Sequence, residues 1–198
     1  VEFIFNKKYN FIINSKFESK IIKYDKSYNN EQSNSIKFQS HLNHIVKVIK
    51  KNFEYNQSII EIGCGKGFFF DLLNKNKFKN IRGFDKTYEG KNSKIIKRYI
   101  NNKDYIPEDL IVLRHTLEHI QNFFEFLKLI KDISSKKTKI LIEVPSLEWI
   151  LKNKAFWDFN YEHVNYFSMK TFESLFKKII YKDMIFEGQY ILIIAEIN

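Results

Sequence analysis

The sequence predicts an α/β domain in which a mostly parallel sheet is covered by helices on both faces. Three observations predict this fold class. From residue 35 onward, short apolar stretches alternate with amphipathic ones, and this alternation is typical of parallel strands joined by helical crossovers. The last two apolar stretches are joined at Glu187-Gly188, which indicates an antiparallel C-terminal hairpin strand. A length of 198 residues suits one domain.

The N-terminal part differs from the rest of the chain. Residues 1–13 alternate between apolar and polar side chains, so they predict a hairpin. Residues 14–34 are polar, and we expect an irregular segment that covers a site. A helix is expected from Ser35, a suitable N-cap, to Asn52, because apolar residues recur there at helical spacing. We therefore divide the chain into an N-terminal extension and lid, residues 1–34, and a main domain, residues 35–198.

The remaining elements follow from apolar runs and their periodicity. Strands are expected at residues 58–62, 80–84, 93–99, 110–114 and 138–144, and helices at residues 68–76, 118–133 and 169–178. The closing hairpin is expected at residues 179–186 and 189–197.

Composition and charge limit the classes of protein. The single cysteine, Cys64, rules out an internal disulfide and suits a reducing cytoplasm. No apolar run is long enough to span a bilayer. The net charge of +10 favours an anionic partner, which leaves nucleic acid, lipid and an anionic small substrate open. Because the chain begins at Val1 rather than Met, we expect a segment of a longer protein.

The segment EIGCGKGFF, residues 61–69, carries the strongest signal. A predicted strand runs into Gly63, Gly65 and Gly67 and then directly into a predicted helix. Glycines permit positive φ and close approach of a ligand to the backbone, and the helix N-terminus offers unpaired N–H groups. The spacing G-x-G-x-G differs from the dinucleotide fingerprint and from the P-loop.

The next predicted strand ends at Asp85, about 20 residues after the turn. A carboxylate at this position can accept hydrogen bonds from both hydroxyls of a ribose. A glycine turn together with an acidic strand end is more specific than either feature alone. The pair therefore predicts a nucleoside-bearing ligand beyond the carboxyl ends of the strands.

This pattern resembles the class I S-adenosylmethionine-dependent methyltransferases over roughly residues 35–198. The resemblance implies a Rossmann-like sheet of seven strands with the last one antiparallel, S-adenosyl-L-methionine as cofactor and S-adenosyl-L-homocysteine as product. It further implies that the glycines lie against the methionine part, Glu61 helps hold its amino group and Asp85 binds the ribose. Leu113 and Arg114 would flank the methionine end. Further cofactor contacts are expected from Cys64, Phe68, Lys86 and Tyr28.

Four further segments resemble a subgroup that includes sugar C-methyltransferases. They are YDKSYNNEQSNS (24–35), LRHTLEHI (113–120), IEVPSLEWI (142–150) and YEHVNYFS (161–168). The resemblance implies His163, beside Glu162, as the catalytic base, with His119 as a second functional histidine. Tyr28 and Tyr166 are expected to orient the acceptor or cover the cofactor. The implied acceptor is a saccharide, nucleotide-linked or phosphorylated precursor of a surface polysaccharide, methylated on oxygen or carbon.

Several structural interpretations stay open beside these roles. His115 and Glu118 also suit capping of the helix expected at 118–133. Phe156, Trp149 and Trp157 suit packing of the core or of a lid. The spacings of His115, His119, Glu143 and His163 match no standard ligand motif, so no metal site is expected.

Two other functions stay as alternatives. A nucleic-acid methyltransferase suits the charge, but LRHT stands where base-amine methyltransferases carry [DN]-P-P-[YF], and arginine is scarce. A non-catalytic module that only binds the cofactor is the second alternative. A homodimer is compatible with the main interpretation and with both alternatives.

Overall fold

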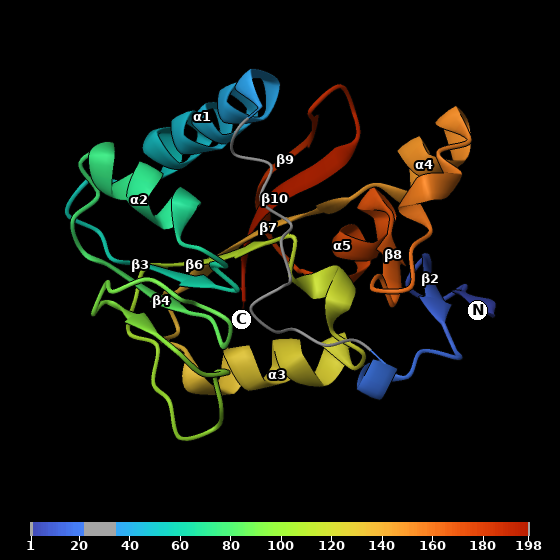
Figure 1. Ribbon diagram of the computed structural model, residues 1–198, viewed down its shortest axis with the longest axis horizontal. Coiled ribbons are helices and arrows are strands. Elements are labelled where there is room, and N and C mark those ends of the chain that lie inside the picture. Colours follow the sequence, from blue (N-terminus) through green and yellow to red (C-terminus); the bar gives the residue numbers. More distant parts are fainter. Residues whose placement is uncertain (1, 22–34, 198) are drawn as a thin grey trace.

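Seven strands form the central sheet of the computed structural model, which describes residues 2–21 and 35–197 (Figure 1). Their order is β5-β4-β3-β6-β7-β10-β9. The strands are β3 (Ile59–Ile62), β4 (Ile81–Phe84), β5 (Ile95–Ile96), β6 (Leu110–Arg114), β7 (Lys139–Pro145), β9 (Ile179–Ile185) and β10 (Tyr190–Glu196). Neighbouring strands pair in parallel in the part β5-β4-β3-β6-β7. Strand β10 pairs antiparallel with both β7 and β9. The predicted α/β fold with its closing hairpin is confirmed.

Helices cover both faces of this sheet (Figure 1). Helices α1 (Ile36–Asn52) and α2 (Phe68–Lys75) pack on one face, and α3 (Phe123–Ile133) and α5 (Met169–Leu175) pack on the other. The Ser35 hydroxyl caps α1 by accepting a hydrogen bond from the N–H of Phe38, as expected. No helix among the described residues is long and apolar enough to cross a membrane.

Alternation along the strands decides which side chains face which helices. In β3, Ile59 packs under α1 and α2, whereas Ile60 packs against the α3 side. The same alternation in β3, β6 and β7 turns one charged side chain of each strand toward α1 and α2. They are Glu61, Arg114 and Glu143, each at or near the carboxyl end of its strand.

A second, smaller sheet joins distant parts of the chain. It consists of β1 (Phe3–Asn6), β2 (Phe11–Asn14) and β8 (Asn165–Phe167) in that order. The expected N-terminal hairpin is thus confirmed, and it is anchored because β2 pairs antiparallel with β8. This pairing holds the start of the chain beside the segment that contains His163.

The helix expected at residues 118–133 begins later than the sequence predicts. A short 3-10 turn covers Leu117–His119, and α3 begins at Phe123 with Asn122 as its N-cap. The side-chain amide of Asn165 donates hydrogen bonds to the carbonyls of Leu117 and Ile120. The backbone is extended at Ile120, with φ −91° and ψ 110°, and this break separates the 3-10 turn from α3.

Other boundaries also shift. The strand expected at residues 93–99 is reduced to Ile95–Ile96, and the helix expected at 169–178 ends at Leu175. Helix α4 (Leu147–Asn153), capped by Ser146, and strand β8 were not predicted. Both are short, and β8 depends on its pairing with β2, which no local pattern shows.

Candidate functional site

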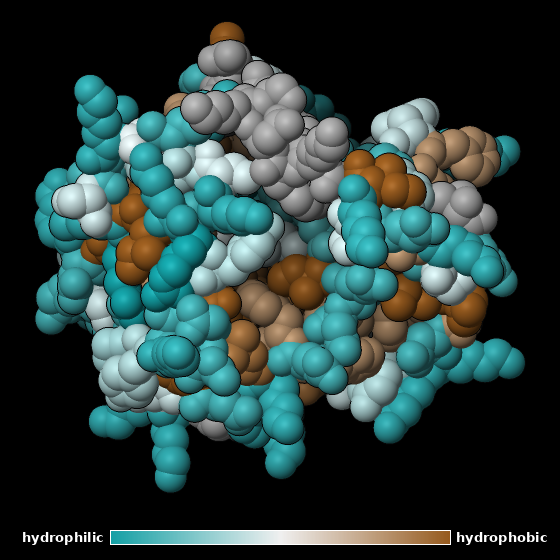
Figure 2. Space-filling model, turned by 60° about the horizontal axis from the view of Figure 1, so that its bottom comes forward, coloured by the Kyte–Doolittle hydropathy of each residue, from teal (hydrophilic) through white to brown (hydrophobic). Residues whose placement is uncertain are grey.

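A cavity of about 790 Å³ opens beyond the carboxyl ends of β3, β4 and β6. Its lining comes from the glycine turn, the loop after β4, the segment after β6 and residues 158–163. Phe17 and Ser19 of the N-terminal extension also line it. In Figure 2, apolar residues gather near the middle of the visible face, between hydrophilic side chains. Ligands of open α/β sheets bind at this edge.

The glycine turn has the backbone that its residues predict. Gly63, Gly65 and Gly67 all have positive φ, at 78°, 53° and 83°. A Cβ on Gly63 would lie 2.4 Å from the hydroxyl oxygen of Thr116, so this position admits only glycine. A Cβ on Gly65 would meet nothing within 4 Å, and Gly65 lines the cavity. The turn is therefore packed against Thr116 at Gly63 and open to a ligand at Gly65.

Asp85 lies directly after β4 and is tied to this turn. Its Oδ2 accepts a hydrogen bond of 2.7 Å from the backbone N–H of Gly65. Its Oδ1 accepts hydrogen bonds from the backbone N–H and the hydroxyl of Thr87, both at 2.7 Å. Asp85 also lines the cavity. Because a carboxylate has about four acceptor sites, it retains capacity for ligand hydroxyls.

Glu61 is a buried carboxyl group at the floor of the cavity, with 2% of its surface exposed. Burial raises its pKa to about 7, although the nearby Arg114 guanidinium acts in the opposite direction. Among the described residues, its Oε2 has no hydrogen-bond partner. A buried carboxyl oxygen without a hydrogen-bond partner suits a ligand ammonium group.

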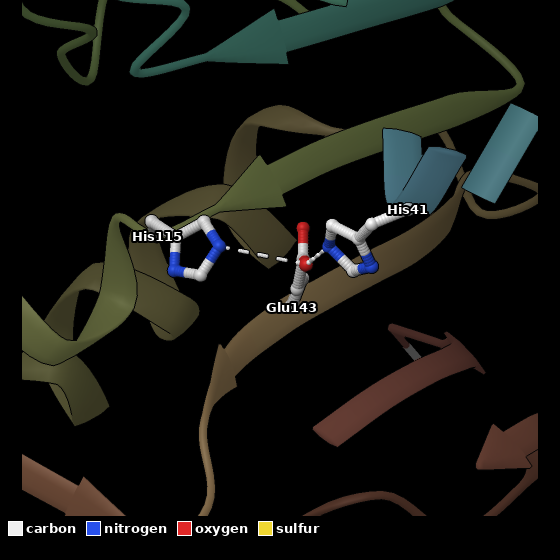
Figure 3. A group of neighbouring side chains, drawn as sticks. All are labelled: His41, His115 and Glu143. Atoms are coloured by element: carbon white, nitrogen blue, oxygen red, sulfur yellow. Dashed lines mark hydrogen bonds and ion pairs between the residues drawn. The ribbon is translucent and has the colours of Figure 1, made fainter. Parts of the chain in front are cut away.

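Glu143 is the centre of a buried ion-pair network (Figure 3). Its Oε2 accepts a hydrogen bond of 2.6 Å from Nε of Arg114, and its Oε1 bonds to Nε2 of His41 on α1. Burial opposes its charge, but Arg114 and His115 outweigh this effect and hold its pKa well below the usual range. The rings of His41 and His115 flank the carboxylate (Figure 3). The network fixes Arg114, whose guanidinium also lies 4.4 Å above the ring of Phe69.

His115 connects this network to a second carboxylate. Its Nε2 lies 3.4 Å from Oε1 of Glu143, and its Nδ1 lies 3.5 Å from Oε1 of Glu118. Burial lowers the pKa of His115, but the two carboxylates outweigh it and raise the pKa to about 9. The backbone of His115 has a positive φ of 46°, which is uncommon for residues other than glycine. His115 and Glu118 therefore pair with each other and do not cap α3.

His119 and His163 face each other beside Glu118, with ring centroids 4.9 Å apart. Nδ1 of His119 lies 3.0 Å from the backbone carbonyl of Glu162. All three residues, Glu118, His119 and His163, line the cavity. Burial lowers the pKa of His163 to about 4, so its imidazole is neutral near pH 7.

A family model described as a methyltransferase domain matches residues 20–179. This match spans most of the chain and includes the glycine turn, Asp85 and the histidines. The chain belongs to the methyltransferase domain family. The prediction made from the glycine turn is thereby confirmed at the level of the family.

The chain is also similar to a protein whose printed name gives no function. An uncharacterised protein of Methanocaldococcus jannaschii, MJ0638, is 25% identical over 155 residues, which cover 71% of this chain and 64% of the relative. The match thus spans less than two thirds of that relative's length.

Solved structures agree in fold. The PH0226 protein of Pyrococcus horikoshii OT3 has a TM-score of 0.64 at 13% identity, covering 83% of this chain and 93% of that one. Magnesium protoporphyrin IX methyltransferase of Synechocystis PCC 6803, solved with bound SAH, has a TM-score of 0.59 at 10% identity, with coverage of 81% and 83%. A SAM-dependent methyltransferase of Archaeoglobus fulgidus has a TM-score of 0.57 at 16% identity, with coverage of 81% and 96%.

The methyltransferase domain brings most of the predicted cofactor residues to the cavity. Cys64, Phe68 and Lys86 line it together with the residues described above. Burial raises the pKa of the Cys64 thiol far above its usual value, so the thiol stays protonated. Two predicted residues lie elsewhere. Leu113 is buried in the core on the α3 side, and Gly67 packs toward Ile95 and Tyr88.

The remaining predicted residues are placed as follows. Tyr28 lies outside the described residues. Glu162 is absent from the described lining of the cavity, although its carbonyl orients His119. Tyr166 is buried, and its hydroxyl donates to the carbonyl of Asn160. Phe156 and Trp157 are each 71% exposed, so they pack in no core.

Sequence reasoning missed the roles of three residues in the site. Glu118 was considered only as a cap, yet it lines the cavity beside both histidines. Thr116 holds the glycine turn, because its hydroxyl donates to the carbonyl of Ile62. His41 lies about 100 positions before its partner Glu143, so no local pattern could have joined them.

Proposed function

We propose that this methyltransferase domain binds S-adenosyl-L-methionine and transfers its methyl group to a small, hydroxyl-bearing acceptor. The observation that carries the proposal is the glycine turn, which is open at Gly65 and hydrogen-bonded to Asp85. This arrangement supports a binding site for a ligand that contains both a ribose and an amino acid.

Three residues fit the separate parts of that cofactor. Gly65 leaves room for the methionine part, and Asp85 offers acceptors to the ribose hydroxyls. The unpaired Oε2 of Glu61 suits the amino group. When bound, the cofactor supplies a methyl group on a sulfonium sulfur, and this chain's residues must position the acceptor in line with it.

The acceptor end of the cavity is polar. His119, His163, Asp158 and Asn160 line it, and each offers a hydrogen-bonding group. This supports an acceptor with several hydroxyls, of the saccharide class, including nucleotide-linked or phosphorylated forms.

His163 and His119 are the residues that we propose to activate the acceptor, with Glu162 orienting His119 through its carbonyl. A neutral imidazole has a lone pair, which either accepts the acceptor's proton directly or binds a cation that makes the hydroxyl more acidic. Either action increases the nucleophilicity of the acceptor oxygen.

The test is transfer of a labelled methyl group from S-adenosyl-L-methionine to a panel of saccharides, nucleotide-linked sugars and RNA. We expect labelling of a saccharide-type acceptor, and loss of labelling in His163→Ala with cofactor affinity nearly unchanged. Labelling of RNA alone would contradict the proposal and favour the nucleic-acid alternative. His44→Ala, which changes an exposed histidine on α1, is the control.

A further inference from the structure

Two groups of side chains in this structure have the composition of a metal site. One group is His41, His115 and Glu143, and the other is Glu118, His119 and His163. Within each group, one ligand atom from every residue lies within 4.8 Å of the others. Two imidazoles and a carboxylate are a donor set that binds divalent transition cations.

In the first group, the carboxylate already has a partner on each oxygen without a cation. The Glu143 carboxylate accepts hydrogen bonds from His41 on one oxygen and from Arg114 on the other. A guanidinium 2.6 Å from the carboxylate would repel a divalent cation. The first group therefore acts as a structural ion-pair network.

The second group differs in its carboxylate. Glu118 is 1% exposed and lines the cavity, yet neither of its oxygens has a hydrogen-bond partner among the described residues. His115 approaches only one of them, Oε1, at 3.5 Å. A buried carboxylate oxygen without a partner is costly unless a ligand completes it.

Both histidines of the second group also present suitable nitrogens. Nδ1 of His163 is buried and has no hydrogen-bond partner among the described residues. In His119, Nδ1 faces the carbonyl of Glu162, and a carbonyl can only accept a hydrogen bond. The neutral ring must then carry its hydrogen on Nδ1, which leaves the lone pair on Nε2. A ligating histidine held by a backbone carbonyl is the usual arrangement around bound metals.

The backbone holds these three residues together before any ligand binds. The N–H of Val164 donates to the carbonyl of Glu118 at 2.9 Å. Asn165 donates to the carbonyls of Leu117 and Ile120. The segment with His163 is thereby fastened to the turn with Glu118 and His119, so little ordering is needed on binding.

From this arrangement we infer that Glu118, His119 and His163 bind one divalent transition cation at the acceptor end of the cavity. Three protein ligands leave an open coordination position, as in catalytic zinc sites. This inference revises the sequence-based expectation that the chain has no metal site. His119 and His163 are 44 positions apart in the sequence, so no ligand motif was visible there. The fold brings their rings together.

The role of the cation rests on the proposed function, whereas its binding does not. An acceptor hydroxyl that occupies the open position would have a lowered pKa and would release its proton to solvent. The resulting oxygen would form a bond to the methyl carbon as the bond between carbon and sulfur breaks, with its electron pair passing to sulfur. The histidines would then act as ligands and not as the base.

The test uses the tag-free full chain, stripped with a chelator and titrated with Co²⁺ in the absence of cofactor. We expect visible absorption bands that saturate at one equivalent and are displaced by Zn²⁺. Glu118→Gln and His163→Ala should each weaken Co²⁺ binding about 100-fold or more, while His44→Ala should bind as the unchanged chain does. Circular dichroism checks that each variant is folded.

The inference would be overturned by the absence of a saturable spectrum, by equal Co²⁺ affinity in both ligand variants and the unchanged chain, or by a sulfur-to-cobalt charge-transfer band that places the ion at Cys64. Loss of binding in His41→Gln but not in His163→Ala would assign the ion to the first group and would also overturn it. A parallel titration with S-adenosyl-L-homocysteine distinguishes failure of the metal site from failure of the proposed function.

Discussion

The backbone N–H of Gly65 donates a hydrogen bond of 2.7 Å to the carboxylate of Asp85. The two residues lie beyond the ends of neighbouring parallel strands, β3 and β4. The bond makes the glycine turn and the acidic strand end one preorganised unit. Changes to either residue should therefore affect the cofactor site while the sheet beneath is retained.

Gly65→Val should abolish binding of S-adenosyl-L-homocysteine while the domain stays folded. The new side chain would enter the open space in front of the turn, where no protein atom lies within 4 Å of its Cβ. Its positive φ adds a cost of about 1–2 kcal/mol to folding. Calorimetric titration and thermal unfolding measure the two effects separately.

The matched control is Gly188→Val. Gly188 also has a positive φ, at 86°, but it is not among the residues that line the cavity. The Gly188→Val variant should lose about as much stability as Gly65→Val and keep the cofactor affinity of the unchanged chain. Equal affinity in Gly65→Val and the unchanged chain would refute the placement of the cofactor against the turn.

Affinity for S-adenosyl-L-homocysteine should rise about tenfold between pH 6 and pH 8. Without ligand, burial holds the pKa of Glu61 at about 7, so the carboxyl is largely protonated at pH 6. A ligand ammonium group favours the carboxylate, so binding at low pH must first remove this proton. The affinity gain is therefore lost as the pH falls through about 7. Glu61→Gln should flatten the profile, and an equally steep profile in that variant would assign the proton to another group.

Glu143→Gln should destabilise the fold by about 3 kcal/mol, because it leaves the Arg114 guanidinium buried without its charge partner. Urea unfolding at neutral pH measures the loss. Glu173→Gln is the control, since Glu173 pairs with Lys182 at the surface and such pairs contribute about 1 kcal/mol or less. If the two variants lose the same stability, the buried network does not have the structural role assigned to it.

Much of the cofactor site could be predicted from the sequence because its signals are local. The glycines that need positive φ lie within five residues, and Asp85 follows directly on an apolar strand. The closing hairpin and the N-cap at Ser35 are local as well. Such features depend on residues that are close together in the chain, so they can be recognised in the sequence.

The acceptor end could not be predicted to the same depth, because its contacts are long-range. Glu118 and His163 are brought together by contacts between distant segments, such as the hydrogen bond from the N–H of Val164 to the carbonyl of Glu118. The pairing of His41 with Glu143 requires α1 to pack on β7. The side chain of Asn165, which is distant in the chain, likewise donates to the carbonyl of Ile120 just before α3. Periodicity contains no information on these contacts.

The most direct test of the account is isothermal titration of the full chain with S-adenosyl-L-homocysteine, with Asp85→Asn as the test variant. Asp71→Asn, which removes an exposed carboxylate on α2 outside the described cavity lining, is the control. The account predicts one site of micromolar affinity, a loss of about tenfold or more in Asp85→Asn, and no change in Asp71→Asn. Absence of binding, or equal affinity in Asp85→Asn and Asp71→Asn, would contradict it.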